Sequence, residues 1–315
     1  MMRLPWENQT VVEFVLKGFS SIQELNIFLF MMFLVFYILI VSGNILIVLL
    51  VSFHHHLHTP MYFFLVNLSF LEIWYTSNIV PKMLKIILAK QKTISVSGCL
   101  AQFYFFGSLA ATECLLLAVM SYDRYLAICQ PLHYPIVMSF PFCIRLAASS
   151  WLCCFLLTAV TTVLLSRLTF CGSNEIDHFF CDFTPLVHLS CMDTSLTETV
   201  AYATSSAVTL VPFLLITASY SSILTAILRI PSGTGRQKAF STCSSHLTAV
   251  AVFYGTLIAT YLVPSANSSQ LLRKGFSLLY TILTPMFNPL IYSLRNRDIH
   301  EALRKCWSKK PRFLA

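Results

Sequence analysis

Residues 120–129 read MSYDRYLAIC and place Asp123 beside Arg124 at the end of a long apolar run, residues 114–120. Two adjacent charges are unusual at the edge of such a run, and an ionisable residue at a membrane surface indicates function. If the run belongs to a helix that spans a bilayer, Asp123 can neutralise Arg124 in one state and release it in another. The pair is therefore a candidate switch.

The composition around this stretch is typical of a membrane protein. Of the 315 residues, 57% are hydrophobic and only 11% are charged, against about 25% charged residues in an average soluble domain. The charges fall in short gaps between apolar blocks, which favours one helical bundle over two soluble domains. The net charge of +8 needs no nucleic acid partner, because many basic residues follow the last apolar block and predict a cytoplasmic C-terminus that faces anionic lipid. These residues are Arg295, Arg297, Arg304, Lys305, Lys309, Lys310 and Arg312.

Seven apolar blocks each reach the roughly 20 residues that a membrane-spanning helix needs. They cover residues 26–53, 60–88, 98–128, 140–165, 197–228, 241–263 and 271–294. We therefore expect an all-α membrane protein with a seven-transmembrane helix bundle over residues 26–294. An odd number of spans with a cytoplasmic C-terminus puts the N-terminus, residues 1–25, outside the cell.

Both ends of the chain carry signals that relate to the membrane. Residues 1–20 contain no contiguous apolar segment, so we expect no cleaved signal peptide and insertion directed by the first apolar block. Asn8 begins an Asn-Gln-Thr tripeptide, a glycosylation acceptor if this end is outside. In the tail, residues 295–315, apolar residues at i, i+4, i+7 and i+8 predict a short amphipathic helix on the cytoplasmic membrane surface. They are Ile299, Leu303, Cys306 and Trp307.

Four of the 11 cysteines lie at the predicted outer end of the bundle, where an oxidising compartment favours two disulfides. The count leaves their connectivity open. The longest gap between spans, residues 166–196, holds three of them, and a loop of that length is usually functional or tied down. The four are Cys99, Cys171, Cys181 and Cys191.

The motif DRY at residues 123–125, at the end of the third span, and NPLIY at 288–292, at the end of the seventh, resemble rhodopsin-like (class A) G-protein-coupled receptors. Further blocks, in order and at family spacing, are similar to vertebrate olfactory receptors of the tetrapod type (class II). The blocks are LHTPMYFFL at 57–65, MSYDRYLAICQPLHY at 120–134, SY at 219–220, KAFSTCSSHL at 238–247 and PMFNPLIYSLRN at 285–296.

Two positions depart from the family pattern, and one of them bears on a possible ion site. Glu72 stands where the second span usually carries an aspartate, and Ser121 stands where the block more often has alanine. The resemblance implies that Glu72 and Glu113 face each other across a sodium-like cation. The alternative is that one carboxyl is protonated and hydrogen-bonded, because two carboxylates that share a site cannot both ionise easily.

The resemblance also implies a disulfide pairing and a G-protein switch. Cys99 with Cys181 matches the bridge of the receptor superfamily, and Cys171 with Cys191 matches an additional olfactory pair, so that the long loop folds over the pocket as a lid. In the switch, ligand favours a packing in which the sixth span moves out and Arg124 leaves its local partner, so that a G-protein helix can enter. The switch residues are Asp123, Arg124, Tyr125, Tyr220, Asn288, Pro289 and Tyr292, with the basic residues Arg236 and Lys238 at the start of the sixth span.

A ligand pocket is expected in the outer half of the bundle. At 3.6 residues per turn, Arg124, Glu113 and Phe106 lie on one stripe of the third span that faces the bundle. Between Glu113 and the outer end of the bundle, the helix faces expected to line the pocket carry no charged side chain. A small, mostly apolar, uncharged molecule is therefore favoured over acids and amines. Packing alone also produces aromatic stripes. The candidate lining residues are Phe106, Gly107, Ala110, Ala111, Thr204, Ser205, Val208, Tyr254, Leu257, Ile258, Tyr261, Tyr280 and Thr281.

The resemblance therefore implies an odorant receptor that couples a small volatile molecule to the stimulatory G protein of olfactory neurons and so to cAMP, at the plasma membrane of olfactory cilia. A receptor for a non-volatile metabolite, expressed elsewhere, is the alternative within this class. A transporter or channel is the alternative from another class, and it requires polar or broken helices along a path through the midplane. Here the inner polar residues stop at Glu72, Glu113 and Asn288.

Two further clusters of residues are better explained without a catalytic or metal-binding role. Ser241, Ser244, Ser245 and His246 are close in sequence, but a serine hydrolase also needs an orienting acid and an oxyanion site, so we expect no enzyme. The histidines at 54–56 and His58 could bind a metal ion, although a polar cytosolic turn is the interpretation we prefer. No cofactor is expected beyond the sodium-like cation.

Overall fold

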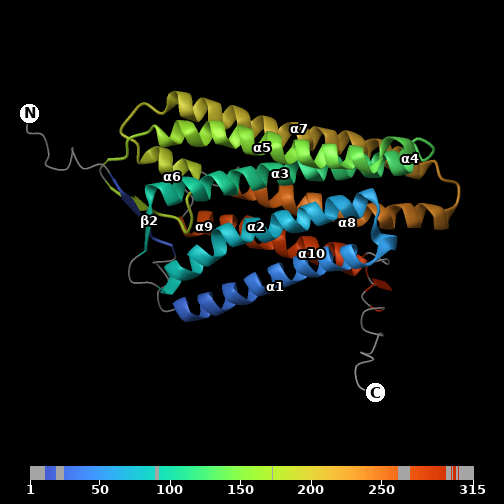
Figure 1. The fold of residues 1–315 in the computed structure, drawn as a ribbon, viewed down its shortest axis with the longest axis horizontal. Coiled ribbons are helices and arrows are strands. Elements are labelled where there is room, and N and C mark those ends of the chain that lie inside the picture. The colour runs from blue at the N-terminus through green and yellow to red at the C-terminus, as the bar shows by residue number, and fades with distance from the viewer. Residues whose placement is uncertain are drawn as a thin grey trace, which may run out of the picture.

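The computed structural model describes residues 11–18, 25–88, 92–171, 173–261, 270–295, 299, 301–302 and 304. Long helices run side by side along the longest axis of the molecule (Figure 1). They are α1 (Asn26–Phe53), α2 (Pro60–Leu88), α3 (Val96–Cys129), α5 (Phe140–Ser166), α7 (Ser195–Leu228), α8 (Gly233–Tyr261), and the unbroken series of α9 (Gln270–Leu278), the π-helical turn η3 (Leu279–Leu283) and α10 (Thr284–Arg295). The short helices η2 (His55–Leu57), α4 (Tyr134–Val137) and α6 (Phe183–His188) lie in connections.

Six of the described helices are long and apolar enough to cross a membrane: α1, α2, α3, α5, α7 and the part of α8 from Cys243 to Thr260. The series α9–η3–α10 completes the bundle, and it exceeds the roughly 20 residues that a span needs. The predicted seven-helix, all-α membrane fold is therefore confirmed. Most of the predicted C-terminal amphipathic helix and the predicted glycosylation site Asn8 lie outside the described residues.

The helix ends follow from local sequence. Pro60 begins α2, where its fixed φ suits the first helical position. At the start of α3, the Ser95 hydroxyl accepts a hydrogen bond from the Gly98 N–H at 3.1 Å and so caps a free backbone donor. α3 ends at Cys129, because Pro131 disfavours the helical conformation at the residue before it.

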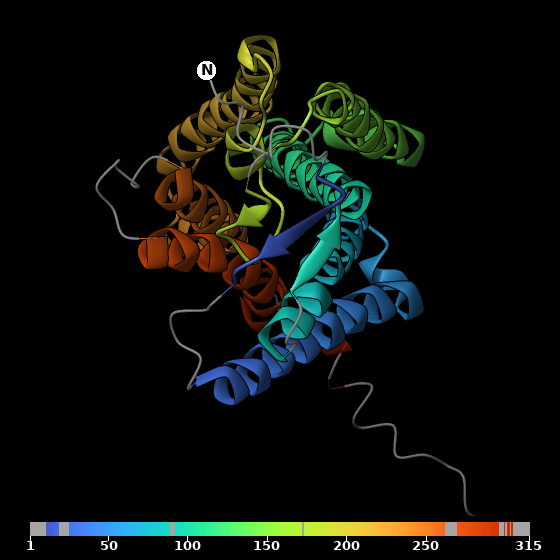
Figure 2. The ribbon, with the colours of Figure 1, turned by 90° about the vertical axis from the view of Figure 1, so that its left-hand side faces the viewer.

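A three-stranded sheet lies across one end of the bundle (Figure 2). β1 (Glu13–Leu16) is the central strand and pairs antiparallel with β2 (Thr93–Ser95) and parallel with β3 (Glu175–Ile176). The sheet therefore joins the segment before α1, the connection between α2 and α3, and the long loop between α5 and α7. We call this end the disulfide end.

A separate apolar core lies beneath this sheet. Phe14 and Leu16 of β1 are fully buried and pack with Cys99, Cys181 and Ile176. The main core runs along the bundle, with α3 packed against α2, α5, α7 and α8. At the other end of the molecule lie α4, the end of α7 and the start of α8 (Figure 1). We call it the Arg124 end.

Candidate functional site

The loop between α5 and α7, residues 167–194, forms a lid that two disulfides hold in place. Cys99 at the start of α3 is bonded to Cys181, and Cys171 is bonded to Cys191 within the loop. These are the pairs that the resemblance implied. The first bond joins the lid to the central helix, and the second closes the lid on itself.

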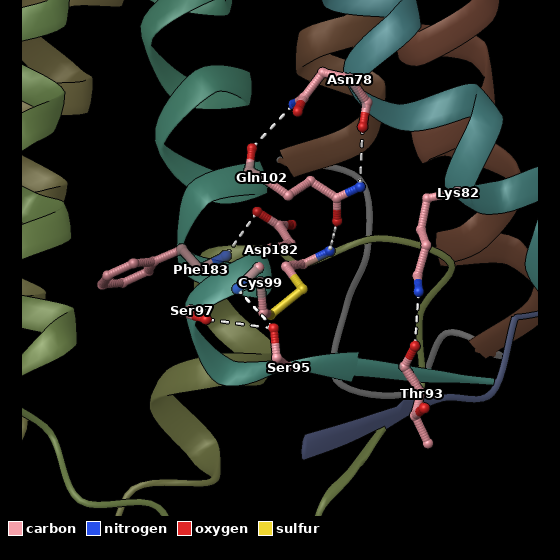
Figure 3. Close-up of a disulfide and its surroundings, with 11 residues drawn as sticks. Asn78, Lys82, Thr93, Ser95, Ser97, Cys99, Gln102, Asp182 and Phe183 are labelled. Carbon is pink, nitrogen blue, oxygen red and sulfur yellow. Dashed lines mark hydrogen bonds between the residues drawn. A yellow bond between two sulfur atoms is a disulfide. The ribbon is translucent and has the colours of Figure 1, made fainter. Parts of the chain in front are cut away.

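Gln102, one turn along α3 from Cys99, connects three segments at the first disulfide (Figure 3). Its amide nitrogen donates to the Asn78 backbone oxygen at 3.1 Å, and the Asn78 side chain donates to the Gln102 backbone oxygen at 3.0 Å. The Gln102 side-chain oxygen accepts the Cys181 N–H at 3.0 Å. One buried amide therefore holds α2, α3 and the lid in register, in addition to the covalent bond.

The lid is also tied to the seventh helix by polar contacts. Lys274 of α9 is only 5% exposed. Its Nζ donates to Asp177 of the lid at 2.5 Å and to the Gly18 backbone oxygen at 2.8 Å. Next to it, His178 Nε2 lies 3.3 Å from the Ser277 hydroxyl. Burial and the nearby Lys274 charge lower the pKa of His178 to about 3, so this imidazole is neutral at physiological pH.

An aromatic cluster lies directly below the lid. Phe106 of α3 contacts Phe180 of the lid at a ring separation of 4.9 Å, Tyr75 of α2 at 5.5 Å and Tyr280 of η3 at 6.2 Å. Phe253 of α8 contacts Tyr280 at 5.9 Å. All five rings are nearly fully buried. Two of the predicted lining residues, Phe106 and Tyr280, are therefore brought together from the third and seventh helices.

The other predicted lining residues of α3 are placed around this cluster. Ala110 packs against the main core and Ala111 is partly buried. Gly107 is different, because a Cβ added to it would meet Thr158 of α5 at 3.1 Å. Gly107 therefore lets α3 approach α5, and its open side faces that helix.

The predicted lining residues of α7 do not all face the bundle core. Val208 packs against the main core. Thr204 is partly buried, and its hydroxyl donates to the Val200 backbone oxygen at 2.7 Å. Ser205 is exposed, and its hydroxyl donates to the Tyr202 backbone oxygen at 3.3 Å. The hydroxyl hydrogens of Thr204 and Ser205 are thus used within their own helix.

The remaining predicted lining residues lie on α8 and in η3. Tyr254 is buried against α7, where its hydroxyl donates to the Thr209 backbone oxygen at 3.4 Å. Leu257 packs against the main core, whereas Ile258 is 46% exposed. Thr281 is buried and donates to the Ser277 backbone oxygen at 2.9 Å. The Tyr261 side chain lies outside what the structure describes.

Midway along the bundle, Glu72 and Glu113 converge on one amide. The Asn288 side chain donates to Glu72 and, at 3.5 Å, to Glu113. The three residues are almost fully buried, so two carboxyl groups share one buried amide. Two carboxylates that share a buried site cannot both ionise easily. The arrangement can therefore hold either a proton on one carboxyl or a cation.

At the Arg124 end, Asp123 is completely buried and accepts two partners. Arg124 Nε donates to it at 3.0 Å, and the Tyr134 hydroxyl of α4 donates to it at 2.8 Å. Burial and the Asp123 charge raise the pKa of Tyr134, so this hydroxyl keeps its proton. Arg124 is therefore held by Asp123 in this packing.

A second contact at this end joins α7 to α8, where the Tyr220 hydroxyl lies 2.7 Å from His246 Nδ1.

The other predicted switch residues are placed less completely. Tyr125 packs between the main core and a small cluster of α7 and α8 residues. Pro289 lies in α10 against Gly43 of α1, whose added Cβ would meet it at 3.5 Å. Arg236 is exposed in the first turn of α8. The side chains of Lys238 and Tyr292 lie outside the described part of the structure.

Comparison with known sequences identifies the family. The sequence profile of the family described as olfactory receptor matches residues 33–310. The chain belongs to the olfactory receptor family. It is 52% identical to human olfactory receptor 11A1 over 298 residues, which is 95% of this chain and 94% of that protein. It is 51% identical to human olfactory receptor 11H4, covering 93% and 91% of the two chains, and 47% identical to mouse olfactory receptor 6B9, covering 95% of each.

The proposed resemblance is thus confirmed. The receptor is a multi-pass membrane protein of the G-protein-coupled class, in which odorants act through a G protein, and it is not an enzyme. Among the described residues, no group of three or more His, Cys, Asp or Glu side chains could hold a metal ion. In the histidine-rich turn, His54 Nδ1 and His58 Nε2 instead contact backbone oxygens of α1 at 2.9 and 3.0 Å.

The sequence did not indicate several residues that join the receptor's lid to the bundle. Lys274 is a buried charge above Glu113 on the seventh span, so the expectation that the stripes there carry none was wrong. Its spacing of three and seven residues from Ser277 and Thr281 is the helical signal that could have revealed it. For Gln102, the signal in the sequence is an amide side chain one helical turn from Cys99. Phe180 had no such signal, because loop positions do not follow a helical period.

Proposed function

We propose that the receptor binds a small, mostly apolar, uncharged volatile molecule in the half of the bundle nearest the disulfide end, and that binding activates a stimulatory, olfactory-type G protein and raises cAMP. The disulfide end then faces outward and the Arg124 end faces the cytoplasm, at the plasma membrane of olfactory cilia. The oxidising outer compartment that disulfides require and the basic residues after residue 294 support this orientation.

The aromatic cluster below the lid is the observation that carries the ligand class. Phe106, Tyr75, Tyr280 and Phe180 join the central helix, the second helix, the seventh helix and the lid in one apolar surface. A molecule that contacts these rings touches every element that the lid connects. Apolar walls with a few hydroxyls favour a small uncharged ligand.

The buried charge of Lys274 does not change this ligand class. Its ammonium group already contacts the Asp177 carboxylate and the Gly18 carbonyl. An acidic ligand would have to displace Asp177, which would leave that carboxylate without its cation. Acidic ligands are therefore disfavoured even though Lys274 is a cation, because Asp177 of the lid already neutralises its charge.

Signalling requires a second packing of the same bundle. In the packing described here, Arg124 is held by Asp123, and Tyr220 joins α7 to α8. We expect the ligand to favour a packing in which α8 moves outward and Arg124 leaves Asp123 to meet a G-protein helix. A ligand can shift this equilibrium only by its difference in affinity for the two packings.

A sodium-like cation between Glu72 and Glu113 is part of the proposal. Asn288 already brings both carboxyl groups to one point, and a cation there would favour the resting packing. The expected result is a shift of the agonist dose response to higher concentration as sodium is raised at fixed osmolarity. A response that does not shift would favour the alternative, a shared proton.

The central experiment is a screen of a chemically diverse odorant panel in cells that carry the receptor and a cAMP reporter. Phe106→Leu should weaken the response to the best agonist, whereas Phe105→Leu, which changes the neighbouring ring packed on Trp74 outside the cluster, should not. A response confined to non-volatile metabolites would support the alternative receptor role. A membrane current without cAMP would support a channel, and a short carboxylic acid as best agonist would contradict the proposed ligand class.

A further inference from the structure

A groove of about 460 Å³ lies between α7 and α8 in the half of the bundle towards the Arg124 end. This volume is within the roughly 300–1,000 Å³ of small-molecule sites. Buried side chains of Ile223, Ile227 and Cys243 lie at its base, and the exposed side chains of Leu224 and Phe240 line it as well. Exposed large apolar side chains on spanning helices face lipid, so the groove is open to the hydrocarbon of the bilayer.

The groove offers little to a polar ligand. Of its hydroxyls, Thr217 donates to the Phe213 backbone oxygen at 2.8 Å and Ser221 donates to the Thr217 backbone oxygen at 2.8 Å. The Tyr220 hydroxyl is engaged with His246 at 2.7 Å. The polar hydrogens are therefore used within the protein, and the free surface of the groove is hydrocarbon. Such a surface suits an acyl chain.

Two arginines lie close in the chain to residues that line the groove. Arg229 follows the last residue of α7, two positions after Ile227, and Arg236 precedes Phe240 by one helical turn of α8. Arg236 Nη2 donates to the Ile230 backbone oxygen at 3.2 Å, so its guanidinium lies beside the residue that follows Arg229. Both side chains are exposed.

These arginines have no acidic neighbour on their own helices. The sequence contains no aspartate or glutamate from Thr199 to Arg297, and no ion pair involves either arginine among the residues that the structure describes. Within the first turn of α8, the Gly235 and Arg236 N–H groups donate to Ser232, so this turn adds only the positive end of the helix dipole. The positive charge at the end of the groove therefore favours an anion, and the apolar walls favour a hydrocarbon chain.

We propose that the α7–α8 groove binds an anionic phospholipid, with one acyl chain along Ile223, Ile227 and Cys243 and its phosphate at Arg229 and Arg236. The combination of a hydrocarbon wall and an uncompensated positive end matches the two parts of that molecule. Anionic lipids are concentrated in the cytoplasmic leaflet, so this placement relies on the orientation under Proposed function, although the binding itself does not. Because Tyr220 lines the groove, the lipid would bear on the contact between α7 and α8.

The test uses the full-length receptor in phosphatidylcholine nanodiscs that contain a small fraction of phosphatidylserine with a photoreactive acyl chain. After illumination, peptide mapping should place the label on α7 and α8. The double variant Arg229→Gln/Arg236→Gln should lower this labelling about tenfold or more, since each basic residue near an anionic surface contributes about 1 kcal/mol. Arg229→Lys/Arg236→Lys should retain most of it, because a lysine keeps the charge at the phosphate.

Two comparisons make the result specific. Arg145→Gln is the matched control, because Arg145 is an exposed arginine near the start of α5 whose Nε also donates to a backbone oxygen, at 3.4 Å. It should leave the labelling unchanged. A photoreactive phosphatidylcholine should label the groove much more weakly than phosphatidylserine. Equal labelling by the two lipids, or no effect of removing both arginine charges, would overturn the proposal, and neither result depends on odorant or G protein.

Discussion

The two ends of the receptor are held together in different ways. At the disulfide end, two disulfides, a three-stranded sheet, the Gln102 amide and the Lys274–Asp177 ion pair connect segments that are far apart in sequence. At the Arg124 end, the described links are side-chain contacts such as Tyr134 with Asp123 and Tyr220 with His246. A receptor built this way can hold a ligand site constant while the opposite end rearranges.

The largest expected effect concerns the bond between the lid and α3. Cys99→Ser opens a loop with a sequence separation of 82, against 20 for Cys171→Ser, so loop-closure entropy predicts destabilisation of about 4–5 and about 3 kcal/mol respectively. Surface abundance by flow cytometry and melting of the purified receptor would measure both. Cys153→Ser, an exposed free cysteine of α5, is the control. A larger loss for Cys171→Ser would show that the second bond dominates this end.

At the opposite end, a substitution should reduce signalling far more than it reduces the amount of receptor. Arg124→Ala removes the group that we propose meets the G protein, so most of the cAMP response per receptor at the surface should disappear, although the buried Asp123 carboxylate loses its cation and some stability is lost as well. Arg145→Ala, an exposed arginine of α5, should have neither effect. Full cAMP output from Arg124→Ala at normal surface level would remove the basis for the proposed switch.

Acid should loosen the disulfide end through His178. Its pKa is lowered from an ordinary value of 6.5 to about 3, so the folded state resists the proton that the unfolded state accepts. Stability is therefore complete above about pH 6.5 and falls as pH decreases from there towards 3. The loss at pH 5 is about 2 kcal/mol.

Melting temperature measured between pH 7 and 5 tests this dependence. His178→Gln keeps a hydrogen-bonding side chain near Ser277 but cannot take up a proton in this range, so its stability should depend less on pH. Lys274 and Asp177 are the charged groups that influence His178. A variant with the same acid sensitivity as the natural sequence would assign the effect to another group.

The parts of this architecture that could be predicted are those set by the bilayer and by short motifs. Uninterrupted apolar blocks predict spans because a backbone in hydrocarbon must satisfy its own hydrogen bonds. The motifs around Asp123 and Asn288 predict the family, and the stripe of the third span predicts that Phe106 and Glu113 face the bundle. Both side chains are buried as expected of such positions.

The parts that could not be predicted depend on contacts between distant segments. Lys274 meets Asp177 and Gly18 across separations of 97 and 256 residues, and no period in the sequence relates them. β1 pairs with two strands that are two and three residues long, which are too short to carry a pattern. Helical spacing predicts that Gly107 faces the pocket, but spacing along one helix does not say which neighbouring helix the residue meets, and here that neighbour is α5.

The smallest expected effect concerns the hydrogen bond between α7 and α8. Tyr220→Phe keeps the ring that stacks on His246 at 5.7 Å and removes only the hydroxyl, at a cost of about 1 kcal/mol. If this bond belongs to the resting packing, its loss should raise cAMP without agonist by up to about fivefold, since RT is about 0.59 kcal/mol. Tyr202→Phe, at an exposed position near the other end of α7, is the matched control and should leave the basal signal unchanged. A fall in basal cAMP in Tyr220→Phe would instead mean that this bond stabilises the signalling packing. Of the two contacts described at this end, only that between Tyr134 and Asp123 would then stabilise the resting packing.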